Sequence, residues 1–142
     1  METVNELLNT LSKDNTPHAG SAGNYSPLTL AYIGDAVFEL LVRTHVLSEN
    51  GNMQAAKLHK KSAAIVCAKA QSEAYFKLLE HLTEDELNTL KRGRNARPHS
   101  MAKKTSVAEY LHATGVETLF GYLFLAGETA RLKELFQIVI SE

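Results

Sequence analysis

The sequence contains no tryptophan and a single cysteine among its 142 residues, and only 7% of the residues are aromatic. A single cysteine excludes an internal disulfide framework and fits a protein of a reducing compartment. Cys67 lies among apolar neighbours, so we predict a small buried core residue and not a reactive nucleophile. The formal net charge is only -1, so the composition as a whole does not indicate a nucleic-acid-binding protein.

The sequence also lacks a long apolar run and a basic N-terminal region. No stretch is long and apolar enough to predict a transmembrane helix. Residues 1–10 carry Glu2 and Glu6 and no basic residue, which is not the pattern of a secretory signal peptide. We therefore expect a soluble cytoplasmic protein with no membrane partner, and the length fits one domain with a sizeable core.

Alternation of apolar and polar residues, the pattern of half-buried β-strands, is absent over any useful length, and helical spacings of apolar residues take its place. The sequence therefore predicts an all-α fold. Helices are expected over about residues 1–12, 27–47, 53–82, 83–94, 106–125 and 128–140. Breaks in this pattern are expected near residues 59–61, at Gly93 and near Thr114–Gly115.

Three short polar sequences predict helix starts. Ser26 is a favoured capping residue, and Pro27 follows it at the first helical position. The segments Thr83–Glu86 and Ser106–Glu109 each have the spacing of a capping box.

The stretch before the first of these starts, residues 13–25, is rich in turn-forming residues. We therefore divide the chain into an N-terminal extension with a mobile linker, residues 1–25, and a helical domain, residues 26–142.

Two carboxylates stand inside strongly apolar predicted helices. Asp35 lies in Tyr-Ile-Gly-Asp-Ala-Val, and Glu117 lies in Val-Glu-Thr-Leu-Phe-Gly-Tyr-Leu-Phe. A buried acid must be neutralised, hydrogen-bonded or bound to a cation. If the two helices pack side by side the acids meet, and Mg²⁺, which one or two carboxylates commonly bind, would relieve their repulsion. The spacing equally permits each acid to face solvent or to pair with a basic side chain such as Arg43.

Positive charge is concentrated in two stretches that contain no acidic residue. Residues 91–104 hold six Lys and Arg residues with a glycine and a proline, which predicts a mobile basic loop, and the second stretch spans residues 57–69. Because aromatic residues are not interleaved with either stretch, a duplex bound through its shape and backbone fits better than stacked single-stranded bases. The residues predicted to contact this duplex are Lys60, Lys61, Lys91, Arg92, Arg94, Asn95, Arg97, Lys103 and Lys104.

Other common sites are not indicated. The six histidines show no pair at metal-ligand spacing, and no P-loop, Rossmann glycine pattern or serine-nucleophile elbow is present.

Four segments, in order along the chain, resemble the Mini-III ribonucleases, the short members of the ribonuclease III superfamily. The segments are Leu30–Glu39, Leu58–Ser62, Leu90–Ala96 and Glu117–Leu125. Together they make a specific match that covers residues 28 to 140 and leaves the N-terminal extension outside.

The resemblance implies a single all-α ribonuclease III-type endonuclease domain that acts as a homodimer on double-stranded RNA. It implies Mg²⁺ as the cofactor, with Mn²⁺ able to substitute, and products with 5′-phosphate and 3′-hydroxyl ends. By position, Asp35 and Glu117 match the catalytic, metal-binding acids of the family, and the segment from Lys91 matches the one that contacts RNA. The family substrate is the precursor of large-subunit (23S) ribosomal RNA, so the implied function is its maturation, with ribosomal proteins as further partners.

The acid set is thinner than that of full-length ribonuclease III. The longer enzymes carry acids at the positions held here by Leu28, Ala31 and Thr114, and Mini-III enzymes share the thinner set. The alternative function is a non-catalytic module that binds double-stranded RNA or the ribosome. Retention of both Asp35 and Glu117 argues against this alternative.

Overall fold

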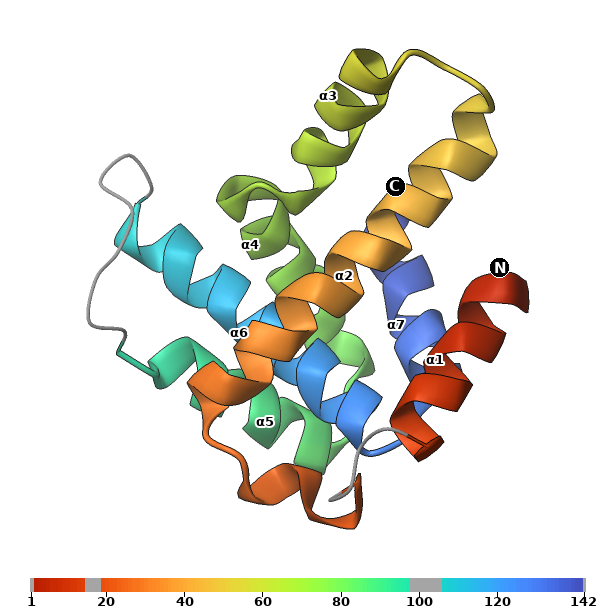
Figure 1. Ribbon diagram of the computed structural model, residues 1–142. Helices are drawn as coiled ribbons and strands as arrows, with labels where there is room; N and C mark the ends of the chain where they lie inside the picture. Colours follow the sequence, from red (N-terminus) through yellow and green to blue (C-terminus); the bar gives the residue numbers. More distant parts are fainter. Residues whose placement is uncertain (1, 15–18, 98–105, 142) are drawn as a thin grey trace.

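The computed structural model describes residues 2–14, 19–97 and 106–141, and within these residues every regular element is helical (Figure 1). The predicted all-α fold is therefore confirmed. None of these helices is long and apolar enough to cross a lipid bilayer. In chain order the elements are α1 (Glu2–Asp14), η1 (Ala19–Asn24), α2 (Pro27–Asn50), α3 (Ala55–Val66), α4 (Ala68–Leu78), η2 (Leu79–His81), α5 (Glu84–Asn95), α6 (Val107–Leu125) and α7 (Thr129–Ile140).

Helix α6 runs through the middle of the molecule and contacts α2, α4 and α5 (Figure 1). It is apolar around most of its circumference, as expected for a helix that is covered on several sides. The Phe120 ring meets Phe38 of α2 edge to face, with 5.2 Å between ring centroids, and Phe38 meets Phe136 of α7 at 6.0 Å. The core is therefore built around α6, and the helix that carries Glu117 has little freedom to move.

Capping hydrogen bonds confirm the predicted helix starts. The Ser26 hydroxyl accepts a bond from the backbone N–H three residues on, and Pro27 begins α2. Thr83 and the glutamate three residues on form the complete capping box of α5. Ser106 accepts the corresponding backbone bond at the start of α6, at 3.1 Å. Local chemistry therefore fixes where these three helices begin.

The long helix predicted over residues 53–82 is two helices, and the break lies at Cys67 instead of near residues 59–61. Cys67 has extended backbone angles (φ -64°, ψ 156°) and is exposed, so the prediction that it is buried in the core was wrong. The break follows packing: α3 buries only Ser62, whereas α4 turns five residues inward. The two helices face different surroundings, and the chain bends between them.

The breaks predicted at Gly93 and Thr114–Gly115 do not occur, because α5 continues to Asn95 and α6 is unbroken. These glycines instead permit close packing of α5 against α6. A Cβ atom on Gly93 would lie 2.3 Å from Thr118 Oγ1, and one on Gly115 would lie 2.9 Å from a backbone oxygen of α5. The first part of the predicted basic loop, up to Asn95, is therefore the last turns of a helix.

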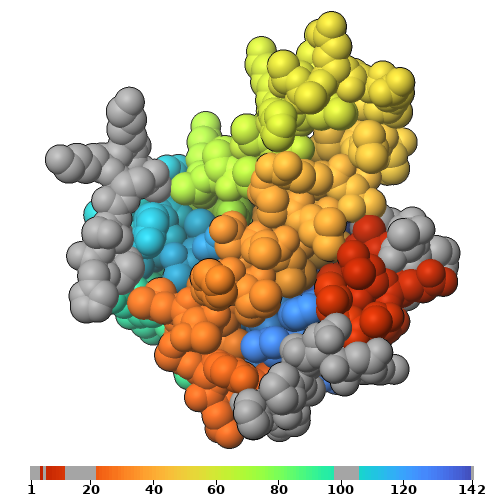
Figure 2. Space-filling view, viewed as in Figure 1, coloured from red at the N-terminus to blue at the C-terminus, as the bar shows by residue number. Residues whose placement is uncertain are grey.

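Helix α3 and the C-terminal end of α2 project from the body as an arm (Figures 1 and 2). Among the described elements, helix α3 makes substantial contact with α2 and α4 only. Its residues Lys57, Lys60 and Lys61 are all exposed. The arm therefore carries a basic surface away from the core.

Helix α1 packs against α7 and buries Val4 and Leu8. Thr129, the first residue of α7, donates a hydrogen bond from its hydroxyl to the side-chain oxygen of Asn9 at 2.6 Å. Residues 15–18 of the predicted linker lie outside the described residues, and the mobility of that linker stays a prediction.

Candidate active site

Helices α2 and α6 cross at a pair of glycines. A Cβ atom on Gly34 would lie 1.7 Å from the backbone oxygen of Glu117, and one on Gly121 would lie 1.9 Å from the backbone oxygen of Leu30. No side chain fits at either position, because real Cβ atoms do not approach other atoms so closely. The two backbones therefore touch, and the residues beside the glycines are drawn together.

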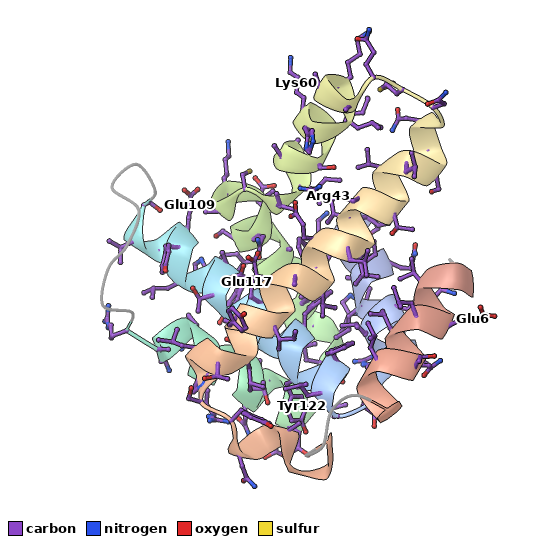
Figure 3. All side chains as sticks on the ribbon, in the orientation of Figure 1. Glu6, Arg43, Lys60, Glu109, Glu117 and Tyr122 are labelled. Atoms are coloured by element: carbon purple, nitrogen blue, oxygen red, sulfur yellow. The ribbon has the colours of Figure 1, made fainter. Side chains whose placement is uncertain are left out.

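The crossing brings Asp35 of α2 and Glu117 of α6 into hydrogen-bond contact. Figure 3 shows Glu117 beside α2 in the middle of the molecule. The pKa of Glu117 is raised from 4.5 to about 8. The main cause is burial, and the hydrogen bond with Asp35 and the negative charge of Asp35 add to it. At neutral pH Glu117 is therefore protonated, and its carboxyl group donates a hydrogen bond to the Asp35 carboxylate. Asp35 itself is on the exposed side of α2, so the pair opens to solvent.

Arg43, the alternative partner that the sequence offered for these acids, has a different partner. Its side chain forms an ion pair with Glu39 one turn away on α2, at 3.0 Å. The sequence predicted that Asp35 and Glu117 would meet if their two helices packed side by side. Helices α2 and α6 do pack side by side, and the two acids are in contact.

The donor set at this pair suits a hard divalent cation. Two carboxyl groups in contact repel when both are ionised, and a cation between them removes that repulsion. No third His, Cys, Asp or Glu joins them as a three-residue metal site in the part of the chain that the structure describes. A site with two carboxylates fits Mg²⁺, which keeps several of its waters when it binds to proteins.

The predicted duplex-contacting residues fall in two separate regions. Lys91, Arg92 and Arg97 are exposed at and just beyond the end of α5. Lys60 and Lys61 are exposed on the arm, and Figure 3 places Lys60 near its tip, away from Glu117. Asn95, the last residue of α5, is also exposed, and Lys103 and Lys104 lie outside the described residues.

Arg94 differs from its basic neighbours because its side chain turns inward. It is half-buried, and its Nη1 donates to the hydroxyl of Tyr75 on α4 at 3.0 Å, while Nε donates to Asn95 Oδ1 at 3.1 Å. The Tyr75 ring packs on His112 of α6, and Nδ1 of His112 lies 2.8 Å from Ser72 Oγ. Burial, and then the charge of Arg94, lower the pKa of His112. Arg94 therefore ties α5 to α4 and α6.

One residue of the site gave no clear signal in the sequence. Thr118, next to Glu117, is buried and its hydroxyl reaches the backbone oxygen of Pro27 at the start of α2, at 3.1 Å. A threonine within an apolar helix commonly bonds only its own helix, so the sequence does not reveal a contact with a residue 91 positions away.

Comparison with known proteins identifies the family. The pattern of the family described as Ribonuclease III domain matches residues 28–128. A protein named Mini-ribonuclease 3 from Clostridium tetani is 45% identical over 116 residues, which is 82% of this chain and 77% of that protein. A protein of the same name from Staphylococcus aureus is 39% identical over 118 residues, which is 82% of this chain and 87% of that protein.

A solved structure has the same fold. The crystal structure of protein FN1578 from Fusobacterium nucleatum superposes with a TM-score of 0.75 at 34% sequence identity, covering 82% of this chain and 93% of that one. Fold, family pattern and sequence identity agree over the same part of the chain. The chain therefore belongs to the ribonuclease III family, and it is an endoribonuclease of the Mini-ribonuclease 3 type.

Proposed function

We propose that this endoribonuclease uses Mg²⁺ held by Asp35 and Glu117 to cleave paired ends of the precursor of 23S ribosomal RNA in the cytoplasm. Its family cleaves double-stranded RNA. The observation that carries the metal part of the proposal is the contact of two acids at the α2–α6 crossing. The choice of RNA rests on the resemblance to Mini-III enzymes, and Mn²⁺ is expected to replace Mg²⁺.

Asp35 and Glu117 are the residues that would hold Mg²⁺, an ion that can activate a water and stabilise charge on a phosphodiester. A carboxyl group binds a cation in its ionised form, so Glu117 would release its proton when the ion binds. The ionised pair would then serve as the ligands of the ion, and neither acid would need to accept a proton from the attacking water. Hydrolysis leaves a 5′-phosphate and a 3′-hydroxyl.

The exposed basic residues would hold the duplex. Lys91, Arg92 and Arg97 at the end of α5, with Lys60 and Lys61 on the arm, are available to contact phosphates. Because they belong to two separate regions, a rod-like substrate that spans both suits them better than a small ligand.

A homodimer would place two acid pairs on one duplex. The exposed side of α2 supports such an interface, because Tyr32 is 81% exposed and Leu28 is 38% exposed on the same face as Asp35. Large apolar side chains exposed together commonly mark a surface that a partner covers. Ribosomal proteins bound to the precursor are further expected partners.

The test is cleavage of a long double-stranded RNA, with and without Mg²⁺, by the wild type and by Asp35→Asn. We expect the substitution to lower the cleavage rate about 100-fold or more, since a metal ligand is removed. RNA binding should persist because the basic residues are unchanged.

Glu39→Gln is the matched control, because Glu39 is an acid on the same helix one turn away that pairs with Arg43. It should cleave like the wild type. Normal cleavage by Asp35→Asn would contradict the metal site.

A further inference from the structure

Thr118 follows Glu117 in α6 and has no solvent exposure (0%). Its hydroxyl oxygen lies 2.7 Å from the backbone oxygen of Thr114, one turn earlier in the same helix. It also lies 3.1 Å from the backbone oxygen of Pro27, in the first turn of α2. The single hydroxyl proton is therefore shared between the carbonyls of two helices.

A third helix closes around the same side chain. The space beside Thr118 is filled by α5 at Gly93, where an added Cβ would lie 2.3 Å from Thr118 Oγ1. The hydroxyl therefore lies at a junction of α2, α5 and α6, shielded from solvent and within hydrogen-bond distance of both acceptors.

Three of the contacts between α2 and α6 lie near the acid pair. Pro27 meets Thr118, Leu30 meets Gly121, and Gly34 meets the backbone of Glu117. The glycine contacts and the packing of Phe38 on Phe120 set how closely the helices approach and limit how far α2 can slide or rotate against α6. A hydrogen bond is directional, so the Thr118 bond resists both movements.

The position of α2 along α6 decides whether the acids meet. Asp35 directly follows Gly34, and Glu117 directly precedes Thr118. A small slide or rotation of α2 therefore changes the separation of the two carboxyl groups, and metal affinity is sensitive to how the ligands are oriented by the groups behind them.

We propose that Thr118 is a positioning residue that holds Asp35 and Glu117 at the separation needed for a divalent cation, through its hydrogen bond to Pro27. The inference rests on the proposed function of the acid pair. Because Thr118 is fully buried, it would act through Pro27 and would not itself contact the cation or the RNA.

The test measures Mn²⁺ binding to the RNA-free protein from the electron paramagnetic resonance signal of the free ion. Thr118→Val keeps the shape but removes the hydroxyl, and Thr118→Ser keeps the hydroxyl. We expect Thr118→Val to weaken Mn²⁺ binding about tenfold and Thr118→Ser to stay within about twofold of the wild type. Asp35→Asn defines the binding that does not involve the acid pair.

Thr89→Val is the matched control. Thr89 is also buried in a helix, and its hydroxyl donates to a backbone oxygen one turn back, that of Asp85, at 3.0 Å. Among the described residues, no bond from this hydroxyl to a neighbouring helix is seen. Thermal unfolding of both valine variants measures how much each hydroxyl contributes to the stability of the fold, separately from its effect on Mn²⁺ binding. Thr89→Val should bind Mn²⁺ like the wild type even if its unfolding temperature falls.

Equal Mn²⁺ affinity of Thr118→Val and the wild type would overturn this inference and leave the acid pair as a metal site. An equal loss of affinity in Thr89→Val would also overturn it, because general destabilisation would then be the cause. If the wild type binds Mn²⁺ no better than Asp35→Asn, the metal site itself is refuted and the role of Thr118 with it.

Discussion

At the scale of single residues, the protein keeps a carboxyl group protonated where it would ordinarily be ionised. Burial and the adjacent Asp35 raise the pKa of Glu117 from 4.5 to about 8. Between these two pH values the folded protein holds a proton that the unfolded chain releases. The stability that this proton contributes is complete below pH 4.5 and is lost as the pH rises through about 8.

We therefore predict that the metal-free protein becomes less stable as the pH rises from about 5 to about 8, and that Glu117→Gln removes most of this dependence. Glutamine keeps the shape and has no proton to lose. Urea unfolding at several pH values, in the presence of a chelator, measures the free energy of unfolding for both proteins. An unchanged pH dependence in Glu117→Gln would mean that other groups are responsible, and Glu39→Gln serves as the control acid.

At the scale of elements, the crossing of α2 and α6 determines whether there is a site at all. Gly34→Ala would add a Cβ atom 1.7 Å from the backbone oxygen of Glu117, so the helices must separate. We predict a loss of stability of about 1–3 kcal/mol from this overpacking, together with a large loss of cleavage because the acids move apart.

Gly23→Ala is the control for this substitution, since its Cβ would meet the Tyr122 ring at an ordinary 3.9 Å. Chemical unfolding and the cleavage rate would be measured for both variants. A Gly34→Ala protein with wild-type stability would show that the crossing adapts more easily than the close approach implies.

Elements were predictable from the sequence where the determining chemistry is local. The starts at Ser26, Thr83 and Ser106 depend on side chains within three residues of the helix, and all three were predicted correctly. The bend at Cys67 and the uninterrupted path through Gly93 were missed, because both depend on which helix lies opposite. The two acids were identified by their apolar surroundings, whereas the contact of Thr118 with Pro27 needs the fold.

At the scale of the whole molecule, a net charge of -1 conceals an uneven distribution of charge. We predict that replacing both Arg92 and Arg97 with alanine weakens RNA binding and reduces the slope of log affinity against log salt by roughly one unit for each phosphate that is no longer neutralised. Arg94 is left unchanged in this variant because it is bonded to Tyr75 and its removal would disturb the fold.

Filter binding at several salt concentrations measures this slope. Lys133→Ala on α7 removes one positive charge outside both basic stretches and should leave the slope unchanged. An unchanged slope in the double variant would exclude the end of α5 from the RNA interface.

The arm bears on where along a bound RNA duplex the enzyme would cut. Helix α2 is continuous from the acid pair to the tip of the arm, and from Asp35 to Asn50 it rises about 22 Å. Helix α3 returns along it with Lys57, Lys60 and Lys61 exposed. We expect that, if these lysines hold a phosphate of the RNA, the length of α2 sets the distance between that phosphate and the bond to be cut. The position of the cut relative to that phosphate is then a property of the helix length.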